Sequence, residues 1–261
     1  LVLTIGYLVT EAESVWLTTR DGRSVPGHVL GFDAATGFGL VQALGDLGVP
    51  ALSLGRSAGL KTGDRAVLAG AGGRQRCVAV EVVARQEFAG YWEYVLDEAL
   101  FTAPAHPHWG GTALIGPEGD LLGIGSLQLQ QGGASGARPI NMVVPIDLLP
   151  PILDDLATRG RANRAPRPWL GLYATESEEG IVVMGLADGG PAETGGLQAG
   201  DVIEAVAGEP VADLAALFRS VWALGEAGVR VPLTVRREGR GVKLALVSGD
   251  RERFLRTPSL H

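Results

Sequence analysis

The sequence predicts a mainly β protein in two parts, an all-β first half and a smaller β/α module. Short runs rich in Val, Leu and Thr alternate with turn signals along the first half, as in barrels and sandwiches. The 261 residues include 39 glycines and 15 prolines, which favour many tight turns over long helices. Apolar residues recur at helical spacing only towards the end of the first half and within the second.

The first half reads as strands joined by short turns. Strands are expected over residues 1–4, 14–19, 25–32, 39–44, 65–69, 78–84, 91–96 and 121–125. Asp21-Gly22 and the segment 117–120 are typical of hairpin turns. From Ile146 to Gly160 the apolar residues follow a helical period, so one amphipathic helix is expected to close this part.

The second half mixes strands with short helices. Strands are expected over 169–173, 180–186, 201–206, 231–236 and 242–247, with helices over 191–197 and 214–224. A basic, proline-containing stretch separates the halves. The expected division is a first domain over 1–158, a linker over 159–168, a module over 169–250 and a C-terminal tail over 251–261.

Composition excludes several classes of protein. The chain carries 22 Lys and Arg against 29 Asp and Glu, a formal charge of -7, so it lacks the basic surface that nucleic-acid binding needs. It contains no run of about 18 apolar residues, so no membrane span is expected. Cys77, the single cysteine, excludes an intramolecular disulfide. The first residues read as a strand and not as a signal peptide.

Four segments of the first half are similar to the HtrA family of trypsin-like serine proteases. Residues 2–9, VLTIGYLV, resemble the family's VLTNAHVV, and residues 31–41, GFDAATGFGLV, resemble GxDxxTDLALL. Residues 107–115, PHWGGTALI, resemble PGNSGGPLV and continue through 118–124, EGDLLGI, similar to DGEVIGI. Residues 140–146, INMVVPI, resemble INFAIPI. The resemblance implies a trypsin-like double β-barrel followed by a PDZ domain.

The catalytic positions depart from the family's pattern. Where the resemblance places the catalytic His the chain has Tyr7, where it places Asp the chain has Gly37, and where it places the nucleophilic Ser the chain has Gly110. Acyl transfer by a serine needs a hydroxyl, an imidazole to take its proton and a carboxylate to orient the imidazole. Glycine supplies neither hydroxyl nor carboxylate, and a phenol titrates near pH 10. A chain without the catalytic triad is therefore expected.

The oxyanion site also departs from the pattern. The family's donors are the N–H groups of the Ser and of a Gly two residues earlier, where this chain has His108. Histidine adopts positive φ less easily than glycine, so the loop is expected to differ. His106 and His108 alternate in sequence and form at most half of a metal site; solvated loop histidines are the expected alternative. Neither a metal nor a cofactor is expected.

The C-terminal module resembles a PDZ domain. Residues 169–172, WLGL, resemble the family's carboxylate-binding loop YLGV, and residues 190–203 resemble the signature GPA…AGLxxGDVI. Such a domain captures a peptide C-terminus with backbone N–H groups and adds the peptide to a sheet edge. Leu170, Gly171 and Leu172 are expected to supply the N–H groups. The predicted groove is lined by Leu172, Val182, Leu214, Leu217, Phe218 and Val221, although core packing alone would also explain the last three.

The first functional hypothesis is an inactive HtrA-like protein that binds protein C-termini or unfolded polypeptide segments. The alternative is an active endopeptidase of periplasmic protein quality control that uses another nucleophile or a metal. Ser126 and Ser135 lie downstream of the lost nucleophile. A homo-oligomer, or a mixed oligomer with an active relative, is a further possibility, because the first barrel lacks about two of the family's N-terminal strands and would expose strand edges. The resemblance implies a periplasmic location.

Overall fold

The computed structural model describes residues 1–132 and 136–255, which form two compact units. The described part of the first unit comprises residues 1–87, 97–132 and 136–163, and that of the second comprises 88–96 and 164–255. Residue 135 and residues 256–261, which include part of the expected tail, lie outside the described residues. The mainly β fold class predicted from sequence is confirmed.

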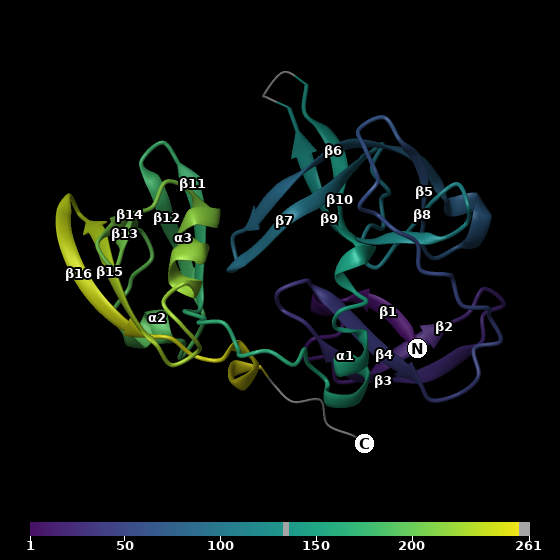
Figure 1. Ribbon diagram of the computed structural model, residues 1–261, viewed down its shortest axis with the longest axis horizontal. Helices are drawn as coiled ribbons and strands as arrows, with labels where there is room; N and C mark the ends of the chain where they lie inside the picture. The colour runs from purple at the N-terminus through teal and green to yellow at the C-terminus, as the bar shows by residue number, and fades with distance from the viewer. Residues whose placement is uncertain (133–135, 256–261) are drawn as a thin grey trace. The chain divides into compact units, whose positions relative to one another are not determined.

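The first unit begins with an open four-stranded antiparallel sheet in the order β1-β4-β3-β2 (Figure 1). Its elements are β1 (Val2–Ile5), the 3₁₀ turn η1 (Gly6–Leu8), β2 (Val15–Thr18), β3 (Ser24–Phe32) and β4 (Phe38–Ala43). Phe38, Leu40 and Val41 are buried because β4 lies in the middle of the sheet. The register pairs Ile5 with Phe38, which brings the start of η1 beside the turn before β4.

Six further strands close into a barrel in the order β10-β7-β6-β5-β8-β9. The elements of this segment are β5 (Arg65–Ala69), η2 (Gly73–Arg76), β6 (Val78–Gly90), β7 (Tyr94–Ala103), β8 (Ala113–Ile115), β9 (Leu121–Gln131) and β10 (Arg138–Pro145). Its core includes Leu68, Val82, Leu100, Leu114 and Val143. A closed barrel has no free strand edges.

The helix expected over 146–160 is interrupted. The chain forms η3 (Ile146–Leu148), then α1 (Leu153–Arg159), which contacts β3. Pro150 and Pro151 stand between them, and proline has no N–H to continue a helical ladder. Gly160 ends α1 in the left-handed region at φ 76°, with its N–H bonded to the Leu156 carbonyl.

The second unit folds around a sheet in the order β11-β12-β13-β15-β16, with β14 paired to β13 (Figure 1). Its elements are β11 (Leu172–Ser177), β12 (Gly180–Leu186), α2 (Pro191–Thr194), β13 (Val202–Val206), β14 (Glu209–Pro210), α3 (Leu214–Trp222), β15 (Arg230–Arg237), β16 (Arg240–Val247) and η4 (Arg251–Phe254). Asp213 caps α3 by accepting a hydrogen bond from the Ala216 N–H at 2.7 Å. Helix α3 contacts β11 and β13.

Two strand predictions need correction. Where a strand was expected over 169–173, the structure has an isolated bridge between Trp169 and Gly249, and β11 begins only at Leu172. The strand is interrupted because the N–H of Gly171 points towards a carboxylate. The strand expected from Tyr91 begins at Tyr94, because residues 91–93 form the turn between β6 and β7. Residues 88–96, which contain this turn, pack with the second unit.

Substituting Gly31 with Ala is expected to destabilise the first unit. A Cβ at Gly31 would stand 1.9 Å from the carbonyl oxygen of Gly160, and backbone cannot move aside as a flexible side chain can. Overpacking of this kind costs about 1–3 kcal/mol, which urea unfolding of the full chain would measure. Gly59→Ala is the matched control, because a Cβ there meets nothing within 4 Å. Equal stability of the two variants would contradict this account of β3 and α1.

Candidate functional site

The three positions of the expected triad lie next to one another. Gly37 follows a turn in which the buried Asp33 carboxylate accepts the Thr36 N–H, and the Gly37 carbonyl accepts the Gly6 N–H at 2.7 Å. Gly6 directly precedes Tyr7. A Cβ built on Gly110 would stand 3.1 Å from the Tyr7 hydroxyl. Tyr7, Gly37 and Gly110 therefore lie close together in the structure.

A phenol occupies the space around position 110. The Tyr7 hydroxyl donates a hydrogen bond to the Ser126 carbonyl at 2.5 Å, and the side chain is half exposed. Partial burial raises the pKa of Tyr7 above its ordinary value, against a weaker opposite effect from Trp109. The side chain is therefore a neutral hydrogen-bond donor at neutral pH, and it holds no proton-accepting nitrogen for a nucleophile.

The loop before Gly110 uses its N–H groups internally. The His108 N–H donates to Nδ1 of His106 at 3.0 Å, so it is committed to that ring. His106 is buried, its own N–H donates to the Asn141 side-chain oxygen, and its Nε2 lies 2.8 Å from the Arg76 carbonyl. Nδ1 accepts a hydrogen bond, so the ring proton sits on Nε2 and the ring is a satisfied structural group.

The expectation of solvated loop histidines is wrong for His106 and holds for the exposed His108. Both ring nitrogens of His106 are engaged in hydrogen-bond contacts. Residues 1–132 and 136–255 hold no cluster of three or more His, Cys, Asp or Glu suited to a metal ion. Within the same ranges no serine hydroxyl bonds to a histidine ring. Ser126 is buried, and Ser135 lies outside the described residues.

A second cluster of polar contacts lies in the C-terminal unit, at the loop before β11. The backbone N–H groups of Leu170, Gly171 and Leu172 all donate to the carboxylate of Glu93, at 3.0, 2.7 and 3.1 Å. Gly171 has φ 75°, a left-handed conformation that lets successive N–H groups turn to the same side. Such a run of N–H groups forms an anion-binding concavity. The three predicted donor residues thus surround one carboxylate.

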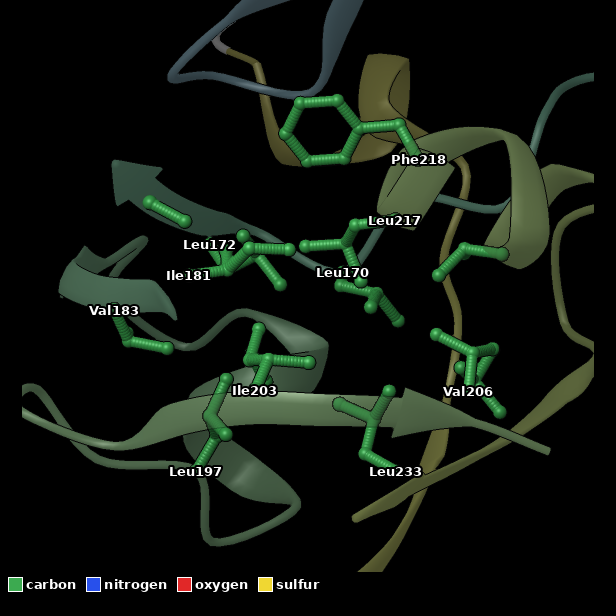
Figure 2. Close-up of a cluster of buried hydrophobic side chains, with 14 of the residues drawn as sticks. Leu170, Leu172, Ile181, Val183, Leu197, Ile203, Val206, Leu217, Phe218 and Leu233 are labelled. Atoms are coloured by element: carbon green, nitrogen blue, oxygen red, sulfur yellow. The ribbon is translucent and has the colours of Figure 1, made fainter. Parts of the chain in front are cut away.

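The predicted groove residues are divided between two environments. Leu214, Leu217, Phe218 and Val221 of α3 are buried in one apolar cluster with Leu170 and Leu172. Figure 2 shows Leu170, Leu172 and Leu217 directed towards a common interior. Val95, from the chain segment after Glu93, belongs to the same cluster. Val182 is half-buried and alternates along β12 with the cluster members Ile181 and Val183, so the structure does not bring it to this set.

Burial sets the charge of Glu93. Loss of water raises its pKa to about 7, while the three backbone N–H groups and the nearby Arg251 oppose this rise by favouring the carboxylate. Arg251 belongs to η4, which the sequence assigned to a C-terminal tail. Phe254 of the same turn packs its ring on Trp169 with centroids 4.8 Å apart. The first residues of the expected tail, in η4, therefore pack near the loop of residues 170–172.

Glu93 was missed by sequence reasoning. It stands in a segment that reads as a strand, and none of its neighbours marks a site. One weak signal was present: an acidic residue amid Tyr91, Trp92 and Tyr94 is unusual for the apolar face of a strand. Its partners lie 77 to 79 residues further on, a separation that no local pattern reveals.

Comparison with known families agrees with this organisation. Residues 1–124 match the family described as trypsin-like peptidase domain, and residues 168–247 match the PDZ domain family. A trypsin-like peptidase domain followed by a PDZ domain is thus the class that the fold and the sites define. Along nearly its whole length the chain is similar to HtrA-type proteins, which supports an HtrA-family protease with a PDZ domain.

Three relatives illustrate the range of similarity. A probable periplasmic serine endoprotease DegP-like of Pseudomonas fluorescens is 28% identical over 95% of this chain and 53% of its own length. The putative serine protease HhoA of Synechocystis is 28% identical over 96% of this chain and 65% of its own length. Among solved structures, the HtrA-type protease AlgW with decapeptide is 26% identical with a TM-score of 0.57, covering 98% of this chain and 80% of that chain.

The chain spans about half to two thirds of the length of the curated relatives it matches. Of the residues that the structure describes, none belongs to a helix long and apolar enough to cross a membrane.

The stability of the chain is expected to depend on the protonation of Glu93. Its pKa is about 7 when folded and 4.5 ordinarily, so the folded state holds the proton more tightly. The stabilisation is complete below pH 4.5 and is lost as pH rises towards 7. Relative to Glu93→Gln, the free energy of unfolding should fall by up to about 1.4 kcal/mol per pH unit in this window. Urea unfolding at several pH values measures it, and parallel profiles for the two proteins would contradict the burial of an ionisable group.

Proposed function

We propose that this chain is a catalytically inactive HtrA-like protein that binds polypeptide ends through its PDZ domain. One observation carries the first half of the proposal: a Cβ at Gly110 would stand 3.1 Å from the Tyr7 hydroxyl. The place of a nucleophile is thus adjoined by a phenol and not by an imidazole. Gly37, beside them, has no carboxylate to orient a base.

The hydrogen bond that the His108 N–H makes within its own loop supports the same conclusion. Stabilising a tetrahedral intermediate requires donors aimed at the developing oxyanion. The His108 N–H instead donates to the His106 ring at 3.0 Å. Both the attacking group and one of the donors implied by the family resemblance are therefore absent from this arrangement.

The peptide-binding half of the proposal is supported by the loop of residues 170–172. Its three N–H groups converge on a carboxylate, which is the group that a peptide C-terminus presents. Strand β11, which follows the loop, lies at the edge of its sheet, where an added strand can pair. The similar HtrA-type protease AlgW has been solved with a decapeptide and with a tripeptide. Leu172 and the α3 residues Leu214, Leu217, Phe218 and Val221 are the apolar side chains proposed to border the bound peptide.

The proposed partners are protein C-termini or unfolded polypeptide segments, and the proposed location is the periplasm, where the DegP-like relatives are named as acting. The open four-stranded sheet with β1 and β2 at its edges is the feature that favours self-association or assembly with an HtrA-like relative. Size measurement by light scattering and co-purification from the host test these two assemblies.

A serine-directed fluorophosphonate probe tests the absence of catalysis. The wild type is expected to remain unlabelled and to leave unfolded casein intact. Trypsin, the positive control, should be labelled and should cleave casein under the same conditions. Gly110→Ser should also stay unlabelled, because a hydroxyl there would have no imidazole to take its proton.

Ser126→Ala is the matched control for a replacement nucleophile. Labelling of the wild type that disappears in this variant would assign catalysis to Ser126 and contradict the proposal. Casein cleavage that is lost on heating and unaffected by Gly110→Ser would contradict it equally. A chelator added to the same assay distinguishes the alternative in which a metal supplies the nucleophile.

A further inference from the structure

The peptide site proposed above is already filled by the chain itself. Residues 88–96 lie within the C-terminal unit, although they are far from its other residues in sequence. We propose that this segment is an internal ligand of the PDZ domain, and that a peptide with a free C-terminal carboxylate binds only by displacing it. The inference rests on the proposed peptide-binding function.

The first resemblance to a bound peptide end is chemical. A peptide C-terminus offers a carboxylate to successive backbone N–H groups. Glu93 offers the same group: one oxygen accepts from Gly171 at 2.7 Å and from Leu172 at 3.1 Å, and the other accepts from Leu170 at 3.0 Å. The side chain is 8% exposed, so water does not compete for these donors.

The second resemblance is the use of the sheet edge. Strand β11 pairs with β12 on one side and ends the sheet on the other. The Ala174 N–H of β11 donates to the Tyr91 carbonyl at 3.0 Å. The rings of Tyr91 and Tyr173 meet edge to face, with centroids 6.1 Å apart. The segment therefore combines a carboxylate at the loop with a main-chain hydrogen bond to the strand that follows, which are the two contacts of strand addition.

The third resemblance is apolar. Val95 is buried in the cluster that contains Leu172, Leu217 and Phe218, and Ala89 packs against the same cluster. One end of the segment thus contributes a buried side chain to the cluster that includes the predicted groove residues. A peptide side chain entering this cluster would need the space that Val95 occupies, because buried interiors are close-packed.

The turn that presents Glu93 is conformationally strained. Glu93 has φ 60°, in the left-handed region that a β-carbon disfavours. Residues in such regions are strained and persist when their surroundings hold them. The Trp92 ring lies over Gly90, where a Cβ would stand 2.8 Å from it. Release of the carboxylate would relieve this strain, which lowers the cost of displacement.

The three N–H donors of residues 170–172, together with the charge of Arg251, identify the competing ligand. Arg251 lies near the bound carboxylate and interacts favourably with its negative charge. Exchanging Glu93 for the terminal carboxylate of a peptide leaves one negative group facing Arg251 and the same three donors satisfied. An amidated peptide end would leave Arg251 without that charge and would be a poorer competitor. The ligand class is therefore a peptide with a free α-carboxylate.

The experiment compares three full-length proteins with two peptide pools. The pools are fluorescein-labelled short peptides with randomised final residues, ending either in a free carboxylate or in an amide. The proteins are the wild type, Glu93→Ala and Glu81→Ala, a control that removes an exposed Glu from β6, the strand before the turn that contains Glu93. Fluorescence anisotropy measures binding, and hydrogen exchange measures protection of residues 88–96.

Glu93→Ala is expected to bind the carboxylate pool about tenfold or more tightly than the wild type and Glu81→Ala, because the wild-type site is only fractionally open. The amidated pool should show no such gain. Adding the carboxylate pool to the wild type should increase exchange in residues 88–96. If Glu93→Ala does not fold, Glu93→Gln and this wild-type exchange measurement decide the question.

Two results overturn the inference in different ways. Equal binding of the carboxylate pool by all three proteins, or wild-type binding without added exchange in residues 88–96, shows that the segment and the peptide do not compete, while peptide binding itself stands. Absence of binding by every folded protein, including Glu93→Ala, shows that the proposed peptide-binding function is wrong, and the competition falls with it.

Discussion

Three backbone N–H groups converging on one carboxylate are the interaction around which the C-terminal unit is organised. Unpaired N–H groups in a buried loop would each cost free energy, so the loop of residues 170–172 needs an acceptor. Glu93 supplies it. Gly171 makes the convergence possible through its φ of 75°, and a Cβ there would stand 3.0 Å from the Trp169 ring. Trp169 is itself held by its pairing with Gly249 and by the ring of Phe254.

The first unit has the framework of a trypsin-like peptidase domain, with Tyr7, Gly37 and Gly110 at the positions where the family resemblance implies catalytic groups. Pairing of β1 with β4 and the hydrogen bond from Gly6 to Gly37 still set these positions side by side. In the proposed function the chemistry of these positions differs, because a phenol and two glycines stand where the resemblance implies groups that attack, accept a proton and orient. The fold alone does not imply the activity; the site must carry it.

Turn residues and the alternation of apolar and polar residues predicted most strands, because both are local signals. The positions Tyr7, Gly37 and Gly110 were singled out by the resemblance to the HtrA family. The donors Leu170, Gly171 and Leu172 were also predicted, whereas their acceptor was not. Glu93 reaches them from 77 or more residues away in sequence. Likewise, the burial of His106 depends on Asn141 and Arg76, each at least 30 residues distant. Long-range partners decide which polar residues are satisfied inside a fold, and a single sequence does not display them.

NMR of the amide protons of Leu170, Gly171 and Leu172 tests directly whether this loop binds a carboxylate. In the wild type we expect the chemical shifts of strongly hydrogen-bonded amides. In Glu93→Ala the three amide shifts should move together, and they should return towards their wild-type values when a peptide with a free carboxylate is added. Amide resonances that are the same in the wild type and in Glu93→Ala, and unmoved by the peptide, would contradict a carboxylate-binding loop.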